Sequence, residues 1–351
     1  MKAIKLSQIG QIARPYQWET YAVKNCLRFD TNTLPSPPPS IKRTIKGLVS
    51  INEYSDPAYR RLKTQIAAYE RVPEEMITVT NSGDEAIDIL AKTFLDPGDR
   101  FVVTPPTYEM FTIQCQINRG IVYEIPLAPK TFAVDAAAII RASKKLRTKL
   151  IFLVNPNNPT GSVIPRLTVT DIVSRSSCAV VVDEAYGEFY GKTVVPLTKK
   201  YNNLIVLKTF SKFAGLAGAR IGYLIANPTL SRVFDAIRFP MGVSTLSANL
   251  AEQVLNNDQP WIEKQILMIK TERKKLAKAL RTLGLSAYPS EANFLLVDVG
   301  NRASSVAAKL AARGVIVRDR STKPYLNGCI RITVRSPKEN TTLIKVLEEI
   351  L

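Results

Sequence analysis

Residues 179–186 read AVVVDEAY, a short apolar run that ends in an acid. Two similar runs flank it along the chain, Leu150–Val154 (LIFLV) and Leu204–Lys208 (LIVLK). Strands that are apolar at successive positions are typical of a parallel sheet with both faces covered. Amphipathic helical patterns, such as 84–94 (DEAIDILAKTF), separate such runs. The sequence therefore predicts an α/β fold with a mostly parallel sheet covered by helices.

The pattern extends on both sides of these runs and then changes near residue 261. Three more strands are expected in the first part, at Ile77–Thr80, Phe101–Thr104 and Ile221–Ile225. After residue 261 a long basic helix to about Leu283 is expected, then a strand, a helix and two strands: Asn293–Val297, Ser304–Arg313, Val315–Arg318 and Ile330–Val334. This part predicts a smaller α+β unit. Residues 30–40 (DTNTLPSPPPS) contain too much proline for a helix and are expected to form an extended linker.

The composition excludes several classes of protein and of site. The 351 residues are 46% apolar and 22% charged, which provides for sizeable cores and excludes a disordered chain. No apolar run approaches the ~18 residues of a membrane span, and the first residues lack the apolar segment of a signal peptide. Histidine is absent, which excludes Ser-His-Asp and Cys-His triads and every His-ligated metal. A proton shuttle must therefore be Lys, Tyr, Asp or Glu, and no metal site is expected.

The cysteines and the net charge bear on compartment and partners. Four cysteines lie far apart with no CxxC spacing, which predicts reduced thiols in the cytoplasm. The formal net charge is +18, and basic residues are densest at Arg141–Lys149 and Lys270–Arg281. Both stretches have helical spacing, so we expect two solvated helix faces rather than a nucleic-acid site. Neither a nucleic acid nor a membrane is predicted as a partner.

Polar residues follow four of the predicted strands, where open parallel sheets bind ligands. Asn81–Glu85 (NSGDE) opens a helix after the first of these strands, and free N–H groups at a helix start suit a phosphate. The others are followed by NPNNPTG (155–161), by Asp183 and Tyr186, and by Thr209–Lys212 (TFSK) with Arg220. Each feature alone is more often structural, such as a capped helix. Together they supply what pyridoxal phosphate requires: a lysine, an acid for the pyridine nitrogen, donors to the ring hydroxyl and a phosphate cup.

Three segments resemble the signature segments of fold-type I, class I and II aminotransferases: NPNNPTG (155–161), VVVDEAY (180–186) and TFSKFAGLAGARIGY (209–223). More closely, the chain resembles the histidinol-phosphate aminotransferase family over nearly its whole length. The supporting segments are RPYQ (14–17), FDTNT (29–33), NSGDEAIDIL (81–90), PPTYEMF (105–111), SEANFLL (290–296), GVIVRD (314–319) and LNGCIRITV (326–334). The resemblance implies an aspartate-aminotransferase-like fold. It also implies a large domain over residues 41–245 that binds pyridoxal 5′-phosphate, and a small domain formed by residues 1–40 and 246–351.

The resemblance further implies roles for individual residues. Lys212 matches the lysine that binds the cofactor covalently and moves the Cα proton, and Asp183 matches the acid on the pyridine nitrogen. Asn158 and Tyr186 match ligands of the ring hydroxyl. Tyr108 matches the aromatic residue that stacks on the ring, and the phosphate positions are Ser82, Gly83, Asp84, Thr209, Ser211 and Arg220. Tyr54 matches a phosphate ligand that the neighbouring subunit supplies, which implies a homodimer.

The implied reaction is transfer of the amino group of histidinol phosphate to 2-oxoglutarate in histidine biosynthesis, giving imidazole acetol phosphate and glutamate. The residues that match substrate ligands are Tyr16, Asn158, Arg318 and Arg331. The segment Val334-Arg335-Ser336 departs from the family and is closer to threonine-phosphate decarboxylase, and we expect Arg335 to be a solvated charge at a strand end. Three alternatives therefore stay open: an aromatic amino acid transaminase, an enzyme like that decarboxylase, and a basic nucleic-acid-binding protein on an inactive enzyme scaffold.

Overall fold

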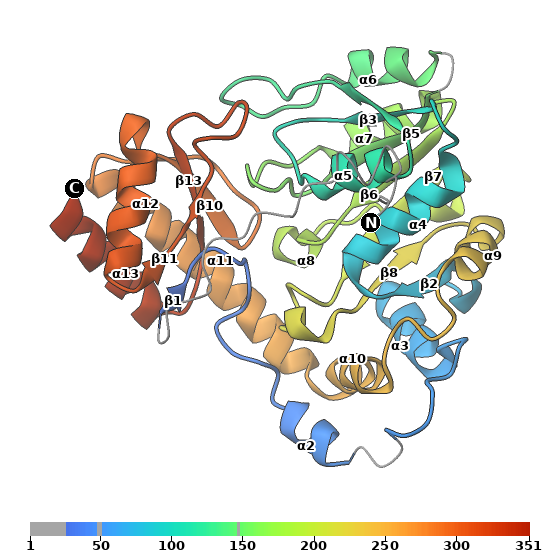
Figure 1. The fold of residues 1–351 in the computed structure, drawn as a ribbon. Helices are drawn as coiled ribbons and strands as arrows, with labels where there is room; N and C mark the ends of the chain where they lie inside the picture. The colour runs from blue at the N-terminus through green and yellow to red at the C-terminus, as the bar shows by residue number, and fades with distance from the viewer. Residues whose placement is uncertain (1–25, 48–50, 146–147) are drawn as a thin grey trace, which may run out of the picture.

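The computed structural model describes residues 26–47, 51–145 and 148–351, which form a larger and a smaller unit (Figure 1). A seven-stranded sheet forms the centre of the larger unit, in the order β2-β8-β7-β6-β5-β3-β4. Its strands are β2 (Ile77–Thr80), β3 (Arg100–Val103), β4 (Ile121–Glu124), β5 (Thr148–Val154), β6 (Ala179–Asp183), β7 (Leu204–Thr209) and β8 (Gly222–Ile225). Strand β8 is antiparallel to both of its neighbours, and the other paired strands are parallel. The prediction of a mostly parallel α/β sheet is confirmed.

Helices cover both faces of this sheet, which explains why its strands are apolar at successive positions. Val180 and Val182 of β6 lie in one core, and Val181, which points to the opposite face, lies in the other. The first core is closed by α3 (Arg60–Glu70), α6 (Ala136–Ser143), α7 (Arg166–Arg175) and α10 (Thr245–Asn257). The second is closed by α4 (Ser82–Phe94), α5 (Met110–Ile117) and α9 (Pro228–Ile237). The short helix α2 (Ile41–Lys46) packs against the first core through Ile41, whereas Phe189 of the short helix α8 (Gly187–Tyr190) enters the core of the smaller unit.

The smaller unit is built on a four-stranded antiparallel sheet in the order β12-β13-β10-β9. Its elements are β9 (Ser286–Ala287), β10 (Phe294–Asp298), β12 (Arg318–Asp319), β13 (Cys329–Thr333) and the helices α11 (Gln259–Thr282), α12 (Ala303–Ala312) and α13 (Pro337–Ile350). Near the start of the described chain, β1 (Leu27–Arg28) pairs in parallel with β11 (Val315–Ile316). Phe29 thereby enters the core of the smaller unit.

Helix α11 runs from the larger unit to the smaller one (Figure 1), and the first core of the larger unit meets the core of the smaller unit along it. Ile262, near its start, belongs to a core of the larger unit, whereas Ile269 belongs to the core of the smaller unit. Helix α10 also packs in the larger unit, through Ala251 and Val254. The packing therefore changes between residues 262 and 269, later in the chain than the expected division after residue 245.

Several local expectations differ from the structure. Strand β4 and helices α5, α6 and α7 were not among the expected elements, and the strand expected over Val315–Arg318 is divided into β11 and β12. The basic cluster Arg141–Lys149 is not one helix face, because α6 ends at Ser143 and Lys149 lies on β5. Residues 30–40 are free of helix, as expected. The other basic cluster, Lys270–Arg281, lies within α11.

Gly222, at the start of β8, allows three backbone segments to approach one another. A Cβ at this position would lie 2.9 Å from the carbonyl oxygen of Lys208, 2.9 Å from the carbonyl carbon of Ser82 and 3.1 Å from the nitrogen of Gly83. Backbone atoms cannot rotate away as a side chain can. A methyl group here must therefore push β8 away from β7 and from the start of α4.

We expect Gly222→Ala to lower the free energy of unfolding by about 1–3 kcal/mol, the usual cost of overpacking. Gly218→Ala is the matched control, because a Cβ there meets nothing within 4 Å. Urea unfolding followed by circular dichroism measures both variants. Equal free energies of unfolding for the two variants would show that the start of α4 can move away from β8 without loss of stability.

Candidate active site

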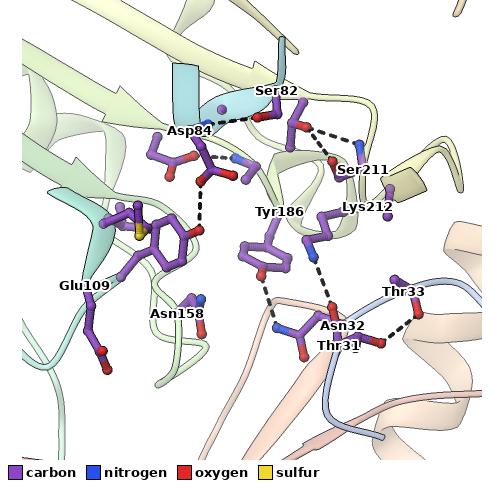
Figure 2. A pocket seen from close by; sticks show the side chains of 18 of the residues that line it. Thr31, Asn32, Thr33, Ser82, Asp84, Glu109, Asn158, Tyr186, Ser211 and Lys212 are labelled. Carbon is purple, nitrogen blue, oxygen red and sulfur yellow. Dashed lines mark hydrogen bonds between the residues drawn. The ribbon is translucent and has the colours of Figure 1, made fainter. Parts of the chain in front are cut away.

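A cavity of about 690 Å³ lies at the carboxyl ends of the parallel strands, where the smaller unit meets the larger one. Val154 and Asp183 contribute from the ends of β5 and β6, and Leu207 and Thr209 contribute from the last three residues of β7. The segment Asp30–Thr33 lines the cavity between the two units. The predicted site residues that line it are Ser82, Gly83, Asp84, Tyr108, Asn158, Asp183, Tyr186, Thr209, Ser211, Lys212, Arg220, Arg318 and Arg331. Figure 2 shows part of this arrangement, with Lys212 beside Tyr186 and facing Thr31.

Lys212 lies in the loop that follows β7, and its amine is inside the cavity. The Nζ atom donates a hydrogen bond to the carbonyl oxygen of Thr31 at 3.1 Å and lies 5.9 Å from the centre of the Tyr186 ring. Burial lowers the pKa of Lys212 to about 8, and the positive charges of Arg331 and Arg220 act in the same direction. Asp84 and Asp183 oppose this shift. Near neutral pH a larger fraction of this amine is therefore neutral and nucleophilic than of a solvated lysine.

Asp183 is the last residue of β6, and its carboxylate is buried at the floor of the cavity. It accepts a hydrogen bond from the nitrogen of Ala185 at 2.8 Å. Burial raises the pKa of Asp183 to about 7, and the negative charge of Asp84 contributes, whereas the hydrogen bond and Lys212 lower it. A carboxylate in this position is stabilised by a ligand that brings a cationic N–H group.

Tyr186 and Asn158 are tied to residues of the smaller unit and of the segment between the units. Asn32 Nδ2 donates to the hydroxyl oxygen of Tyr186 at 3.0 Å (Figure 2). Arg331 Nη1 donates to Asn158 Oδ1 at 2.7 Å, and Nη2 donates to the carbonyl oxygen of Asp30. The guanidinium group of Arg331 also lies over the Phe294 ring, 5.4 Å from its centre. These contacts hold the phenol, the amide and one guanidinium group around a common space.

The start of α4 and the loop after β7 form a small polar cup. Ser82 has φ 75°, a backbone conformation that is uncommon outside glycine and is concentrated at functional sites. Thr209 Oγ1 donates to Ser211 Oγ at 2.9 Å and accepts from the nitrogen of Ser211 at 3.1 Å. Hydroxyl groups and the N–H groups of a helix start are the donors that bind phosphate. The cup therefore suits a phosphate group.

The carboxylate of Asp84, at the start of α4, binds two other side chains that line the cavity. It accepts a hydrogen bond from the hydroxyl of Tyr108 at 2.8 Å and forms an ion pair with Arg220 at 2.7 Å (Figure 2 shows the first contact). The resemblance implies that Asp84 is one of the phosphate positions. The side chain of Asp84 has a role of its own, since it binds both the guanidinium group of Arg220 and the phenol of Tyr108.

Among the described residues, one predicted site residue does not line the cavity. Tyr54 is 85% exposed and lies outside the cavity of its own chain. Tyr16 lies outside the described residues. Arg335, expected as a solvated charge, is instead largely buried: its Nε donates to Glu339 Oε1 at 2.7 Å and its Nη1 to the carbonyl oxygen of Arg28 at 3.2 Å. That expectation was wrong because α13 begins beside β13 and places Glu339 next to the guanidinium group.

Sequence reasoning missed Arg320 and Glu109, which line the same cavity. Arg320 Nη2 forms an ion pair with Glu109 Oε1 at 2.9 Å, and Lys323 lies 3.3 Å from Glu109 Oε2. These two cations hold the pKa of Glu109 below its ordinary value although burial raises it. One signal was available for Arg320, because in extended chain it lies two residues beyond Arg318 and so on the same side. Nothing in the sequence indicated Glu109 as its partner.

Among the described residues there is no group of three or more Cys, Asp or Glu side chains placed to hold a metal ion. No helix in the described ranges is long and apolar enough to cross a membrane.

The family model for aminotransferase class I and II matches residues 24–347. The chain belongs to this family. It is 37% identical to a histidinol-phosphate aminotransferase of Thermoanaerobacter sp. (strain X514), over 95% of each protein. Its structure resembles that of the histidinol-phosphate aminotransferase from Sinorhizobium meliloti in complex with pyridoxal-5′-phosphate, with a TM-score of 0.90, 26% identity and coverage of 98% of this chain and 97% of the other. A Thermus thermophilus aspartate aminotransferase variant, 23% identical over 99% of both chains with a TM-score of 0.81, shares the fold. The resemblance drawn from the signature segments is confirmed.

We expect the Lys212 amine to react at a lower pH than a solvated lysine, whose ordinary pKa is ~10.4. Reductive methylation with formaldehyde, followed across pH by mass spectrometry of peptides from cofactor-free protein, should give a midpoint near 8 for Lys212. Arg331→Ala removes a positive charge that lowers this pKa and should move the midpoint upward. A midpoint near that of solvated lysine in the wild-type protein would contradict the prediction.

Proposed function

We propose that this chain binds pyridoxal 5′-phosphate and transfers the amino group of histidinol phosphate to 2-oxoglutarate, giving imidazole acetol phosphate and glutamate. One observation carries the proposal: a lysine of lowered pKa and a buried carboxylate face one cavity, together with three arginines, Arg318, Arg320 and Arg331. The relatives named for this reaction support the choice of substrate.

The residues of the cavity fit this cofactor at each of its functional groups. Asp183 is an acid whose pKa is raised by burial, and a protonated pyridine nitrogen would supply a positive charge that stabilises its carboxylate. The cup formed by Ser82, Gly83, Thr209 and Ser211 fits the phosphate, with Arg220 at its rim. Tyr186 and Asn158 fit the ring hydroxyl, and Tyr108 fits the face of the ring. Lys212 fits the aldehyde.

When bound, the cofactor supplies an electron-accepting ring that stabilises negative charge at the substrate carbon that loses its proton. Lys212, once its amine is free, accepts that proton, since a pKa near 8 places it close to the working range of a general base. Asp183 stays ionised beside the ring nitrogen and keeps it protonated. The hydrogen bond from Asn32 holds the phenol of Tyr186 in place at 3.0 Å.

Arginines at the wall of the cavity account for both substrates. Arg331 is held by Asn158 and by the carbonyl of Asp30, and its planar guanidinium group suits a carboxylate or phosphate at that end of the cavity. Arg318 of β12 lies opposite Arg331 of β13 in the antiparallel sheet, and both residues line the same wall of the cavity. Phosphorylated amines and dicarboxylates both carry anionic groups that such a wall attracts.

The proposal includes a homodimer in the cytoplasm. Tyr54 is exposed on its own chain, which suits a side chain that reaches the phosphate cup of a partner subunit. The four cysteines are free, which suits a reducing compartment. We also propose a larger, cofactor-binding domain and a smaller domain that includes the N-terminal segment, with the division of the chain lying within α11.

Lys212→Ala is expected to keep the fold and to bind pyridoxal 5′-phosphate without covalent attachment. Borohydride should then trap no adduct on the protein, and transamination should fall by at least ~10²–10⁴-fold, the usual contribution of a positioned acid–base group. Lys200→Ala, at an exposed lysine outside the cavity, is the control. Near wild-type activity of the Lys212 variant would show that another residue is the base.

Arg318→Ala and Arg331→Ala should affect the two half-reactions differently. Loss of the Arg318 guanidinium should reduce kcat/KM for histidinol phosphate by about 10- to 150-fold, because hydrogen bonds to charged groups contribute ~1.5–3 kcal/mol. The half-reaction with glutamate should hardly change. Arg331→Ala should weaken both half-reactions, since the carboxylate of glutamate needs that arginine too.

Single-turnover kinetics with histidinol phosphate, phenylalanine and threonine phosphate measure these effects and separate the alternatives. Equal losses for glutamate and histidinol phosphate in the Arg318 variant would remove the phosphate-binding role of Arg318. A preference for phenylalanine would indicate the aromatic transaminase. Release of carbon dioxide from threonine phosphate would indicate the decarboxylase. Binding of DNA that weakens steeply with salt, without cofactor binding, would indicate an inactive scaffold.

A further inference from the structure

A second group of charges is buried in the larger unit, on the face of the sheet opposite to the cavity. Lys208 precedes Thr209 on β7, and successive strand residues point to opposite faces. The Lys208 Nζ atom lies 2.9 Å from Glu70 Oε1, 2.9 Å from Glu188 Oε1 and 3.9 Å from Glu184 Oε2. All four side chains are 7% exposed or less. We refer to these four residues as the Lys208 cluster.

Neighbouring donors complete the Lys208 cluster. Glu184 accepts hydrogen bonds from Thr193 Oγ1 at 2.6 Å and from the nitrogen of Val194 at 2.7 Å. Glu70 accepts a hydrogen bond from the hydroxyl of the buried Tyr223. Burial raises the pKa of Glu184 to about 7 and raises that of Glu188, and the Lys208 charge opposes both shifts. One ammonium group therefore serves three carboxylates.

An arrangement of this kind is a poor way to stabilise a fold. Well-packed apolar side chains of the same size often stabilise a fold as much or more, because each buried charge loses its hydration. A buried charged cluster is better explained as a device that holds the surrounding strands and helices in one arrangement rather than another. The positions of the Lys208 cluster in the chain indicate which geometry that is.

Three members of the Lys208 cluster are close in sequence to residues that line the cavity. Lys208 is followed by Thr209 of the cup, and Glu184 follows Asp183. Glu188 lies two residues beyond Tyr186, in α8. The nitrogen of Glu184 also donates to the carbonyl oxygen of Leu207 at 2.8 Å, so the ends of β6 and β7 are joined at this level. The fourth member, Glu70, ends α3 and ties that helix to the same point.

We propose that Lys208 is a positioning residue for the cofactor: by binding Glu184, Glu188 and Glu70 at once, it fixes Asp183 and Tyr186 relative to Thr209 and the cup. The cofactor must meet the acid at its ring nitrogen and the cup at its phosphate together. A relative movement of the ends of β6 and β7 therefore weakens its binding. The inference rests on the proposed binding of pyridoxal 5′-phosphate.

Three variants and a matched control test the proposal. Lys208→Arg keeps the charge, Glu188→Gln removes one carboxylate charge and leaves Lys208 in place, and Lys208→Met removes the ammonium group. Arg273→Met removes a cation that is buried to a similar degree, but from α11, where it binds Glu291 and the carbonyl oxygen of Ala292. Each protein is prepared without cofactor. Its melting temperature is measured, and its Kd for pyridoxal 5′-phosphate is then obtained by absorbance titration.

We expect Glu188→Gln to raise the Kd about 10- to 100-fold, the loss typical when a residue that orients ligands is altered, without lowering the melting temperature. Lys208→Met should raise the Kd by at least as much, and Lys208→Arg should restore most of the affinity. Arg273→Met should lower the melting temperature and leave the Kd unchanged. If Lys208→Met does not fold, the other two variants decide.

The positioning role would be overturned if both Glu188→Gln and Lys208→Met bound the cofactor with the wild-type Kd. If Lys208→Met does not fold, a wild-type Kd in Glu188→Gln alone would overturn it. Either result would leave the proposed function intact. If the Kd of every variant, the Arg273 control included, changed only in proportion to its melting temperature, the positioning role would also be overturned. Failure of the wild-type protein to bind pyridoxal 5′-phosphate would instead refute the proposed function, and the inference with it.

Discussion

The parallel strands β5 and β6 end at the same level of the central sheet, β7 continues two residues further, and the candidate site is arranged around that edge. In the register of the sheet, Val154 lies beside Asp183, and Asp183 lies beside Leu207. Neighbouring strands are separated by ~4.8 Å. The asparagine loop after β5, the acid at the end of β6 and the cup after β7 are therefore held within about two strand spacings of one another. Helices pack on both faces of the sheet that carries this edge.

Charge in the cavity is distributed so that the chemical groups keep different protonation states. Lys212 lies among positive charges, which together with burial lower its pKa to about 8. Asp183 lies in a buried site near Asp84, and its pKa rises to about 7. Arg220, by contrast, is paired with Asp84, and Arg320 is paired with Glu109. The arginines that attract anionic substrates thus also help to lower the pKa of the lysine.

The smaller unit completes the cavity rather than only flanking it. Arg331 of β13 reaches Asn158 in the larger unit, and Asn32 in the connecting segment reaches Tyr186. Asn32 is itself held by Thr333, and its carbonyl oxygen accepts a hydrogen bond from Asn293. The segment over residues 30–33 is therefore part of the site, although its composition indicates only an extended linker. The substrate-binding and cofactor-binding parts of the site are joined through these polar contacts.

The sequence by itself determined the α/β class, the strands that end at the site and most of the residues around it. Strand cores, turn residues and signature segments are local patterns, and parallel pairing brings their ends together without further information. Only the tertiary structure decided that Glu109 meets Arg320, that Arg335 is buried against Glu339, and that α10 packs with the larger unit. It also decided that Lys208 gathers three carboxylates from separate elements. Most of these depend on contacts between residues far apart in the chain, and the burial of Arg335 also depends on the carbonyl oxygen of Arg28. Local patterns in the sequence do not show which distant residues meet or which side of an element is covered.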